Sequence, residues 1–213
     1  EFNNTRAAVA TSVEVRIPLT NGLSVVDGSG YPIQVKGNHA IVHPGNLLSG
    51  QSKKIYLTLR VPTHKEQTFA IKGINAHYRY KDSSYTVNLD DAFQIACVKD
   101  QQEVYSSIDK SEWEEKVVKE DINRLREEVA TDIKKGSKKG ALRRIEEYFQ
   151  AQRSVNAVVA SPKVATSLEK DLGGLRDMVE DTFQGAPQEV EQKQKKNSKA
   201  LQYEGYSGRR SGK

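Results

Sequence analysis

The sequence has very little of what builds disulfides, cysteine-based metal centres or membrane spans. Its 213 residues include a single cysteine, Cys97. One cysteine excludes an internal disulfide and a zinc site made of several cysteines. No apolar run approaches the roughly 18 residues that a helix needs to cross a bilayer, so no transmembrane segment is expected. The fold must therefore be held by apolar cores, and the chain is long enough for two modest ones.

Charged residues are plentiful, at 29%, and the net charge of +5 is unevenly distributed. Residues 1–100 hold 11 basic and 8 acidic side chains, residues 101–185 hold 15 and 17, and residues 186–213 hold 7 and 3. The basic excess thus lies in two regions with an acidic one between them. A nucleic-acid-binding protein usually concentrates its positive charge on one face, so this distribution argues against nucleic acid as the main partner.

The first hundred residues alternate apolar and polar side chains with a period of two, as half-buried β-strands do. The alternation is clearest over residues 55–61, and a similar run covers residues 11–17. Turn-forming residues separate such segments. Near Gly73 the alternation changes phase, which predicts a β-bulge within one long strand. About eight strands at this spacing predict an antiparallel β-sandwich over residues 1–100.

Beyond residue 100 the apolar residues recur at spacings of three and four, the period of an α-helix. Ser161-Pro162 is a clear helix start, an N-cap residue followed by proline in the first turn. We predict a β-to-α boundary between about residues 99 and 111, and a helical hairpin or a three-helix unit over residues 101–186. The whole chain is then an α+β protein. The apolar stripes run over residues 113–133, 142–155 and 164–183.

Residues 187–213 are rich in Gln, Lys and Glu and contain few apolar side chains. Such a composition cannot bury enough apolar surface to offset the entropy of ordering the chain. We therefore predict a flexible basic tail, with at most a short helix before Leu201.

Residues that could carry catalysis are present but do not form a catalytic pattern. His39 and His43 lie about 13 Å apart if they share a strand, too far to bind one metal ion. No Gly-x-Ser-x-Gly nucleophile motif occurs, and Asp90 and Asp91, as neighbours on a strand, would point to opposite faces. We predict no catalytic residue, no metal site and no cofactor, and hence that the chain is not an enzyme.

Five residues are candidates for binding a partner: Trp113, Tyr203, Tyr206, Arg209 and Arg210. Trp113 begins the first helical stripe and is expected to be a packing anchor, where that helix meets the sandwich, more than an exposed contact. The other four alternate aromatic and basic groups in the predicted tail. They could stack on a nucleic acid or contact an acidic partner, although such tails are commonly only solvated chain ends.

Several segments have a recognisable pattern. Residues 9–17 read VATSVEVRI and precede Gly30-Tyr31-Pro32, and residues 44–51 (PGNLLSGQ) lead into an apolar strand that ends in Val-Pro. With residues 136–142 and 195–203, they resemble the region that follows the von Willebrand factor type A domain in many bacterial proteins of that family. The Asp-x-Ser-x-Ser metal signature of the type A domain itself does not occur here.

The resemblance implies a non-catalytic accessory region that mediates protein–protein contacts next to an upstream type A domain. It also implies a secreted bacterial protein, located in the periplasm or at the cell surface. The alternative is binding of nucleic acid or an anionic surface through the basic tail. Salt would separate the two, because binding to phosphates weakens steeply as ionic strength rises. The basic side chains that would bind phosphates are those of Lys193, Lys195, Lys196, Lys199, Arg209 and Arg210.

Overall fold

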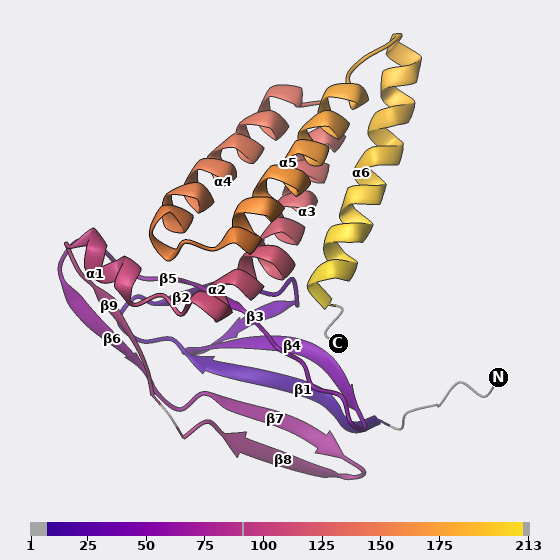
Figure 1. Ribbon diagram of the computed structural model, residues 1–213. Helices are drawn as coiled ribbons and strands as arrows, with labels where there is room; N and C mark the ends of the chain where they lie inside the picture. Colours follow the sequence, from indigo (N-terminus) through magenta and orange to yellow (C-terminus); the bar gives the residue numbers. More distant parts are fainter. Residues whose placement is uncertain (1–7, 91, 211–213) are drawn as a thin grey trace. The chain divides into compact units, whose positions relative to one another are not determined.

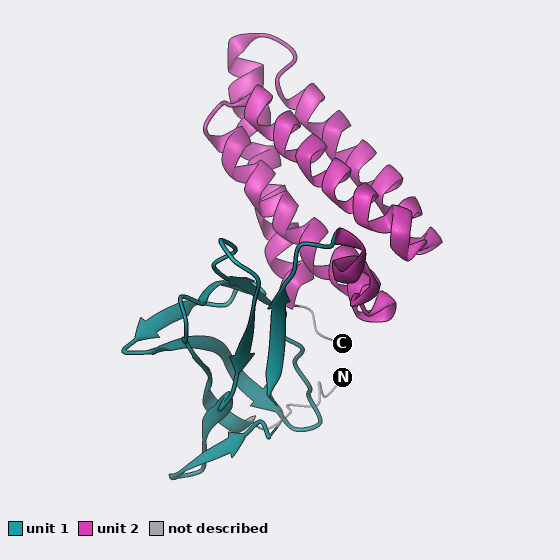
Figure 2. Ribbon diagram, turned by 90° about the vertical axis from the view of Figure 1, so that its left-hand side faces the viewer, with its two compact units in different colours: residues 1–100, 212–213 teal, residues 101–211 magenta. Residues whose placement is uncertain are grey.

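The computed structural model describes residues 8–90 and 92–210. The chain divides into two compact units, with the boundary between Asp100 and Gln101 (Figure 2). Strands make up the first unit and helices the second (Figure 1). The predicted α+β fold, with strands first and helices after them, is confirmed.

The described part of the first unit contains nine strands, and every pair of neighbouring strands is antiparallel. Five strands form one sheet in the order β3-β4-β1-β7-β8, and two small sheets pair β2 with β5 and β6 with β9. The strands are β1 (Ala8–Pro18), β2 (Ser24–Gly28), β3 (Ile33–Lys36), β4 (His39–Leu48), β5 (Leu57–Arg60), β6 (Gln67–Ile71), β7 (Asn75–Tyr80), β8 (Ser83–Asn88) and β9 (Phe93–Cys97).

The core of this unit joins all three sheets in a sandwich-like arrangement. Ile17 and Val42 of the large sheet are buried together with Ile71 of β6. The apolar residues of the alternating run 55–61 all pack against this cluster. The period of two over that run therefore identifies the side chains that contact the core, all of which are partly buried.

One local prediction in the β region needs correction. The phase change near Gly73 is not a bulge in one strand. It is a loop with Gly73 at φ +74°, and on either side of it β6 and β7 belong to different sheets. The strand predicted over residues 11–17 is present within β1, and it contains an irregularity at Ser12, which has φ +51° and where the pairing of β1 with β4 shifts register.

The second unit is a bundle of long helices. α2, η1 and α3 follow one another without a break, and η1 is a turn of π-helix. The predicted start at Ser161 is confirmed, since its hydroxyl accepts a hydrogen bond from the Val164 N–H. The elements are α1 (Gln101–Ser106), α2 (Lys110–Glu115), η1 (Lys116–Asp121), α3 (Ile122–Lys134), α4 (Lys138–Val159), α5 (Pro162–Thr182) and α6 (Pro187–Arg210).

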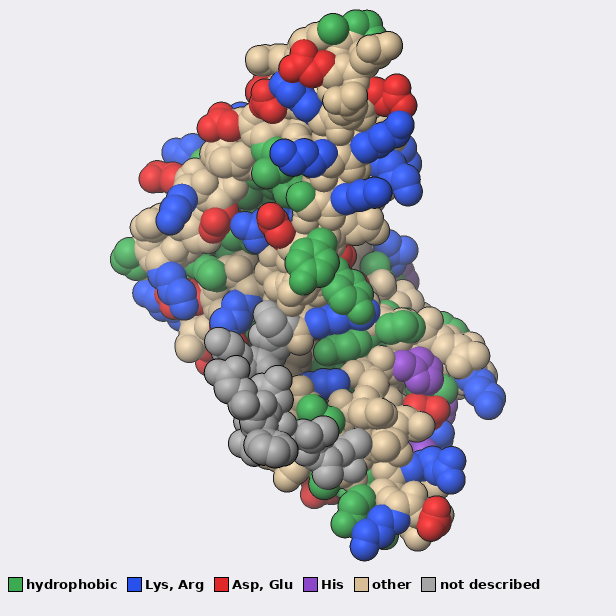
Figure 3. Space-filling view, turned by 90° about the vertical axis from the view of Figure 1, so that its right-hand side faces the viewer, with side chains coloured by type: hydrophobic (Ala, Val, Ile, Leu, Met, Phe, Trp, Pro, Cys, Tyr) green, Lys and Arg blue, Asp and Glu red, His purple; other side chains and the backbone are tan. Residues whose placement is uncertain are grey.

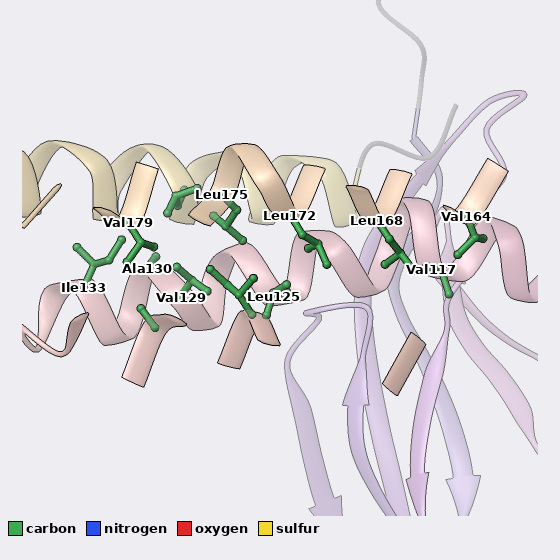
Figure 4. Close-up of a cluster of buried hydrophobic side chains, with 13 residues drawn as sticks. Val117, Leu125, Val129, Ala130, Ile133, Val164, Leu168, Leu172, Leu175 and Val179 are labelled. Carbon is green, nitrogen blue, oxygen red and sulfur yellow. The ribbon is translucent and has the colours of Figure 1, made fainter. Parts of the chain in front are cut away.

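The first and third predicted stripes pack on each other in this bundle. Figure 4 shows Leu125, Val129 and Ile133 of α3 pointing toward side chains of α5. The α5 residues Leu172, Leu175 and Val179 are all buried. Ile145 of α4 is fully buried in the same cluster. The core thus forms where helical spacing places apolar residues on one side of each helix.

The predicted flexible tail is wrong over residues 187–210, which form α6, and the bundle has one more long helix than predicted. α6 lies along α3 for much of its length (Figure 1). Its inward side contains Leu201, which is buried, but also Ser198 and Gly205. A helix whose inward side is largely small and polar gives almost no hydrophobic signal, which explains the error. Residues 211–213 lie outside the described residues.

Candidate interaction surface on helix α6

One side of α6 presents a stripe of basic and aromatic side chains. Lys199, Tyr203, Tyr206 and Arg210 recur at spacings of four, three and four, so they lie on one side of the helix. That side is opposite Leu201, which faces α3. Tyr203 is 72% exposed and Tyr206 is 51% exposed. Figure 3, which faces the side where α6 lies in Figure 1, shows blue basic and green apolar side chains next to one another.

Within this stripe, Tyr206 and Arg210 form a defined pair. The Arg210 guanidinium lies 3.9 Å from the centroid of the Tyr206 ring. An Arg210 N–H also donates a hydrogen bond to the Tyr206 hydroxyl. A guanidinium stacked on an aromatic ring presents a cationic, planar and partly apolar surface. Two of the five predicted residues are thus brought into direct contact, and Tyr203 lies about one turn before them.

The stripe is presented outward because the opposite side of α6 lies very close to α3. A Cβ atom added at Gly205 would meet the Asn123 carbonyl oxygen and the Glu127 Cγ, both at 2.6 Å. A Cβ at Gly208 would collide with the Asn123 side chain. The two glycines therefore allow the helix axes to approach, as small residues do at tight helix–helix contacts.

Arg209 is not an exposed binding residue, contrary to the prediction. Only 3% of its side chain meets solvent, and it is held by two carboxylates. Its guanidinium lies 2.6 Å from a Glu120 oxygen and 3.0 Å from a Glu127 oxygen. Glu120 is itself 5% exposed. Arg209 therefore anchors the end of α6 to η1 and α3, and its charge is directed inward.

Glu120, the more buried of the two partners of Arg209, belongs to an irregular turn. η1 is π-helical, and its last two residues, Glu120 and Asp121, are both buried. Asp121 accepts hydrogen bonds from the Lys116 ammonium at 2.9 Å to each carboxylate oxygen. A π-helical turn adds a residue to the helical repeat and changes which side chains face inward. No motif in the sequence marks this turn, and the acidic pair Glu120-Asp121 is the only signal that could have drawn attention to it.

Trp113, the remaining candidate, is a packing residue of the helical unit. It lies in α2, is half-buried, and packs against the helical core cluster. Its predicted role as a contact between the two units stays a prediction.

Two of the basic residues proposed for anion binding are paired within the chain. Lys193 lies 2.8 Å from an Asp181 oxygen, and this hydrogen bond raises the pKa of Lys193. Lys195 lies 2.6 Å from a Glu191 oxygen and lowers the pKa of Glu191 through the same kind of bond. Each shift favours the charged form of the group concerned. With Arg209 directed inward, α6 presents less net positive charge than its composition indicates.

The described residues contain neither a cluster of metal ligands nor a helix that could span a membrane. No three or more of their His, Cys, Asp and Glu side chains are grouped so that they could hold a metal ion. None of their helices is both long and apolar enough to cross a membrane. Comparison with family models, with curated proteins and with solved structures yields no match.

Proposed function

We propose that this chain is a non-catalytic interaction region and that the exposed stripe of α6 binds a protein partner. The observation that carries the proposal is the exposure of Tyr203 and Tyr206 on a helix that is anchored from its opposite side. Tyrosine and arginine are enriched among the residues that dominate protein–protein binding energies. Aromatic side chains held on a rigid helix also lose little entropy on binding.

The arrangement favours a groove in the partner that is apolar at its centre and acidic at its rim. Tyr203 and Tyr206 are placed to enter such a groove, as the anchors of a recognition helix do at spacings of three and four. Lys196 and Lys199 precede the tyrosines and Arg210 follows them. Basic groups at both ends of the stripe would then meet the acidic rim and direct the helix into register.

Binding of nucleic acid or an anionic surface is the weaker alternative. Tyrosine rings can stack on bases, but Lys193, Lys195 and Arg209 are engaged with carboxylates of the chain itself. Fewer cations are then available to neutralise phosphates, and the affinity for nucleic acid depends on that number.

A photo-crosslinking amino acid placed at position 203 tests the proposal in the full chain. We expect a crosslink to a protein at position 203 and none at position 147, an exposed site on α4. The crosslinked protein is then purified, and its affinity is measured for the wild type and for Tyr203→Ala and Tyr206→Ala. Each variant should bind at least about tenfold more weakly. Crosslinks only to nucleic acid, or equal crosslinking at both positions, would overturn the proposal.

From the sequence resemblance alone, we further propose that this region accompanies a von Willebrand factor type A domain in a bacterial protein outside the cytoplasm. The residues encoded upstream of Glu1 test this directly. An Asp-x-Ser-x-Ser signature within a type A domain there supports the assignment, and its absence refutes it.

A further inference from the structure

The five-stranded sheet of the first unit ends in two unlike edges. The edge strand β3 has four residues, follows Pro32 and ends at Lys36. Proteins commonly protect sheet edges from pairing by short strands, prolines and lysines, and β3 has all three devices. The edge strand β8, Ser83–Asn88, contains neither a charged residue nor a proline. Its pairing with β7 runs through all six residues without a bulge. The β8 edge therefore lacks this protection.

The side of the sheet that carries the core also continues onto β8 without cover. The strand registers place Ile33, Val42, Val15, Ala76 and Val87 in one row across all five strands. In this row Val42 is fully buried, whereas Val87 is 56% exposed. All six residues of β8 are exposed. An apolar side chain in line with the core is thus left in solvent at the edge.

Aromatic residues extend this apolar side and hold it in shape. Tyr85 of β8 lies directly opposite Tyr78 of β7, and their rings stack with centroids 5.5 Å apart. Tyr80 lies near the same ring, at 6.5 Å. The alternate residues Ser84, Thr86 and Asn88 form the other, polar side of the strand. The edge is therefore amphipathic and uncharged.

We propose that β8 pairs with β8 of a second copy of this chain, in antiparallel order about a two-fold axis perpendicular to the sheet. The outward-facing backbone groups of an edge strand can form a continuous ladder of hydrogen bonds with another extended strand. β8 itself is a strand of the required kind. Rotation about an axis perpendicular to the sheet does not exchange its two faces. The apolar residues of both copies therefore lie on the same face and meet. The result is one continuous ten-stranded sheet.

Overlap and charge together select the register of this pairing. Centring it on Tyr85 or Thr86 pairs five residues of β8 with the second copy, and other centres pair fewer. Opposite residues must lie on the same side of the sheet, so a single residue of β8 sits on the axis. If Thr86 were on the axis, Asp82 would face Asp90 of the second copy, and like charges directly opposite one another repel. With Tyr85 on the axis, Asp82 instead faces Asn88, and the two Tyr85 residues face each other. The register centred on Tyr85 is therefore the one we infer.

Sedimentation equilibrium of the full chain tests the pairing. We expect the wild type to dimerise and Val87→Lys to raise the dimer dissociation constant at least about tenfold, since the symmetry brings the unpaired ammonium into the interface twice. Val35→Lys is the matched control, because Val35 is 64% exposed on the protected β3 edge of the same sheet. This control should dimerise like the wild type. Circular dichroism checks that both variants are folded.

Crosslinking identifies the strand involved. In a Cys97→Ser background, a cysteine at Thr86 lies diagonally across the axis from its copy, within about 8 Å. A short bis-maleimide should therefore join two chains through position 86, and not through a cysteine at Gln34 on β3. A wild type that stays monomeric at every concentration overturns the proposal, as does a dimer that Val87→Lys leaves intact or that crosslinks equally at position 34. Tyr203→Ala should leave the dimer unchanged, which separates this surface from that of α6.

Discussion

Arg209 carries a positive charge into a position where only 3% of its side chain meets solvent. Removing two charges from water is expensive, and their mutual attraction offsets that expense only while both partners are present. The interaction of Arg209 with Glu120 is therefore conditional. It stabilises α6 as long as neither side chain is lost.

A first prediction follows for this pair. Arg209→Met should lower the free energy of unfolding of the helical unit by about 3–5 kcal/mol, because Glu120 stays buried after its ion pair with Arg209 is lost. The double variant Arg209→Met, Glu120→Leu should recover much of that loss, since apolar residues often replace a buried ion pair without penalty. Urea denaturation followed by circular dichroism at 222 nm measures both. Lys195→Met, which removes an exposed ion pair, is the control and should change stability little. Equal effects of Arg209→Met and Lys195→Met would contradict this account.

Two glycines inside helices provide a second, matched prediction. Gly174 in α5 has nothing within 4 Å of an added Cβ, so Gly174→Ala should stabilise the protein by about 0.5–1 kcal/mol through helix propensity alone. At Gly205 the same gain is opposed by contact with a backbone carbonyl oxygen at 2.6 Å, which cannot simply rotate away. We expect Gly205→Ala to destabilise the protein. Thermal melts of the two variants should shift in opposite directions, and a shared upward shift would show that α6 does not lie close to α3.

At the scale of elements, the helices that apolar periodicity could predict are those whose inward side is apolar. The stripe from Val164 to Val179 is buried along α5, and the N-cap at Ser161 marks its start. In contrast, the inward side of α6 packs through glycines and the charged side chain of Arg209. These residues produce no periodic pattern of apolar side chains in the sequence. The sequence also could not predict that β6 and β7 belong to different sheets, because a loop at Gly73 and a bulge produce the same change in the phase of the alternation.

The packing of α6 predicts slow amide exchange where the sequence indicated a flexible tail. Amide protons around Leu201, which is 1% exposed, should exchange with deuterium about as slowly as those around Val129 in α3. In Arg209→Met, the amides from Gly205 onward should exchange faster, because the end of α6 has lost its anchor. Mass-spectrometric hydrogen exchange resolves these segments. Complete exchange around Leu201 within seconds would mean that α6 is not stably docked.

For the whole molecule, period and composition were sufficient to predict the α+β class and the change from strands to helices. They were insufficient to predict the candidate interaction surface on α6. Composition places Tyr203, Tyr206 and Arg210 in a flexible tail, but only the helix places them on one side and directs Arg209 to the other. That separation depends on Glu120, which lies far from Arg209 in the sequence. A sequence pattern within a single segment cannot predict a contact between residues so far apart.

Each unit has its own buried cluster, one among the strands and one among the helices. We therefore expect residues 101–210 to fold without the first hundred, with a cooperative urea transition. The shorter fragment 101–186, which matches the helical domain predicted from the sequence, lacks α6. Its α3 would lose the cover of Leu201, and Glu120 would lose Arg209.

We expect this loss to make fragment 101–186 much less stable than 101–210, although it retains the apolar stripes of α3, α4 and α5. Exposure of Leu201's neighbours alone removes about as much stability as a large-to-small core substitution, roughly 2–5 kcal/mol. Fragment 101–210 carrying Leu201→Ala provides that reference value. If 101–186 unfolds at the same urea concentration as 101–210, then α6 is accessory to the bundle. If 101–210 is itself unfolded, the helices depend on the strands, and the two units are not independent.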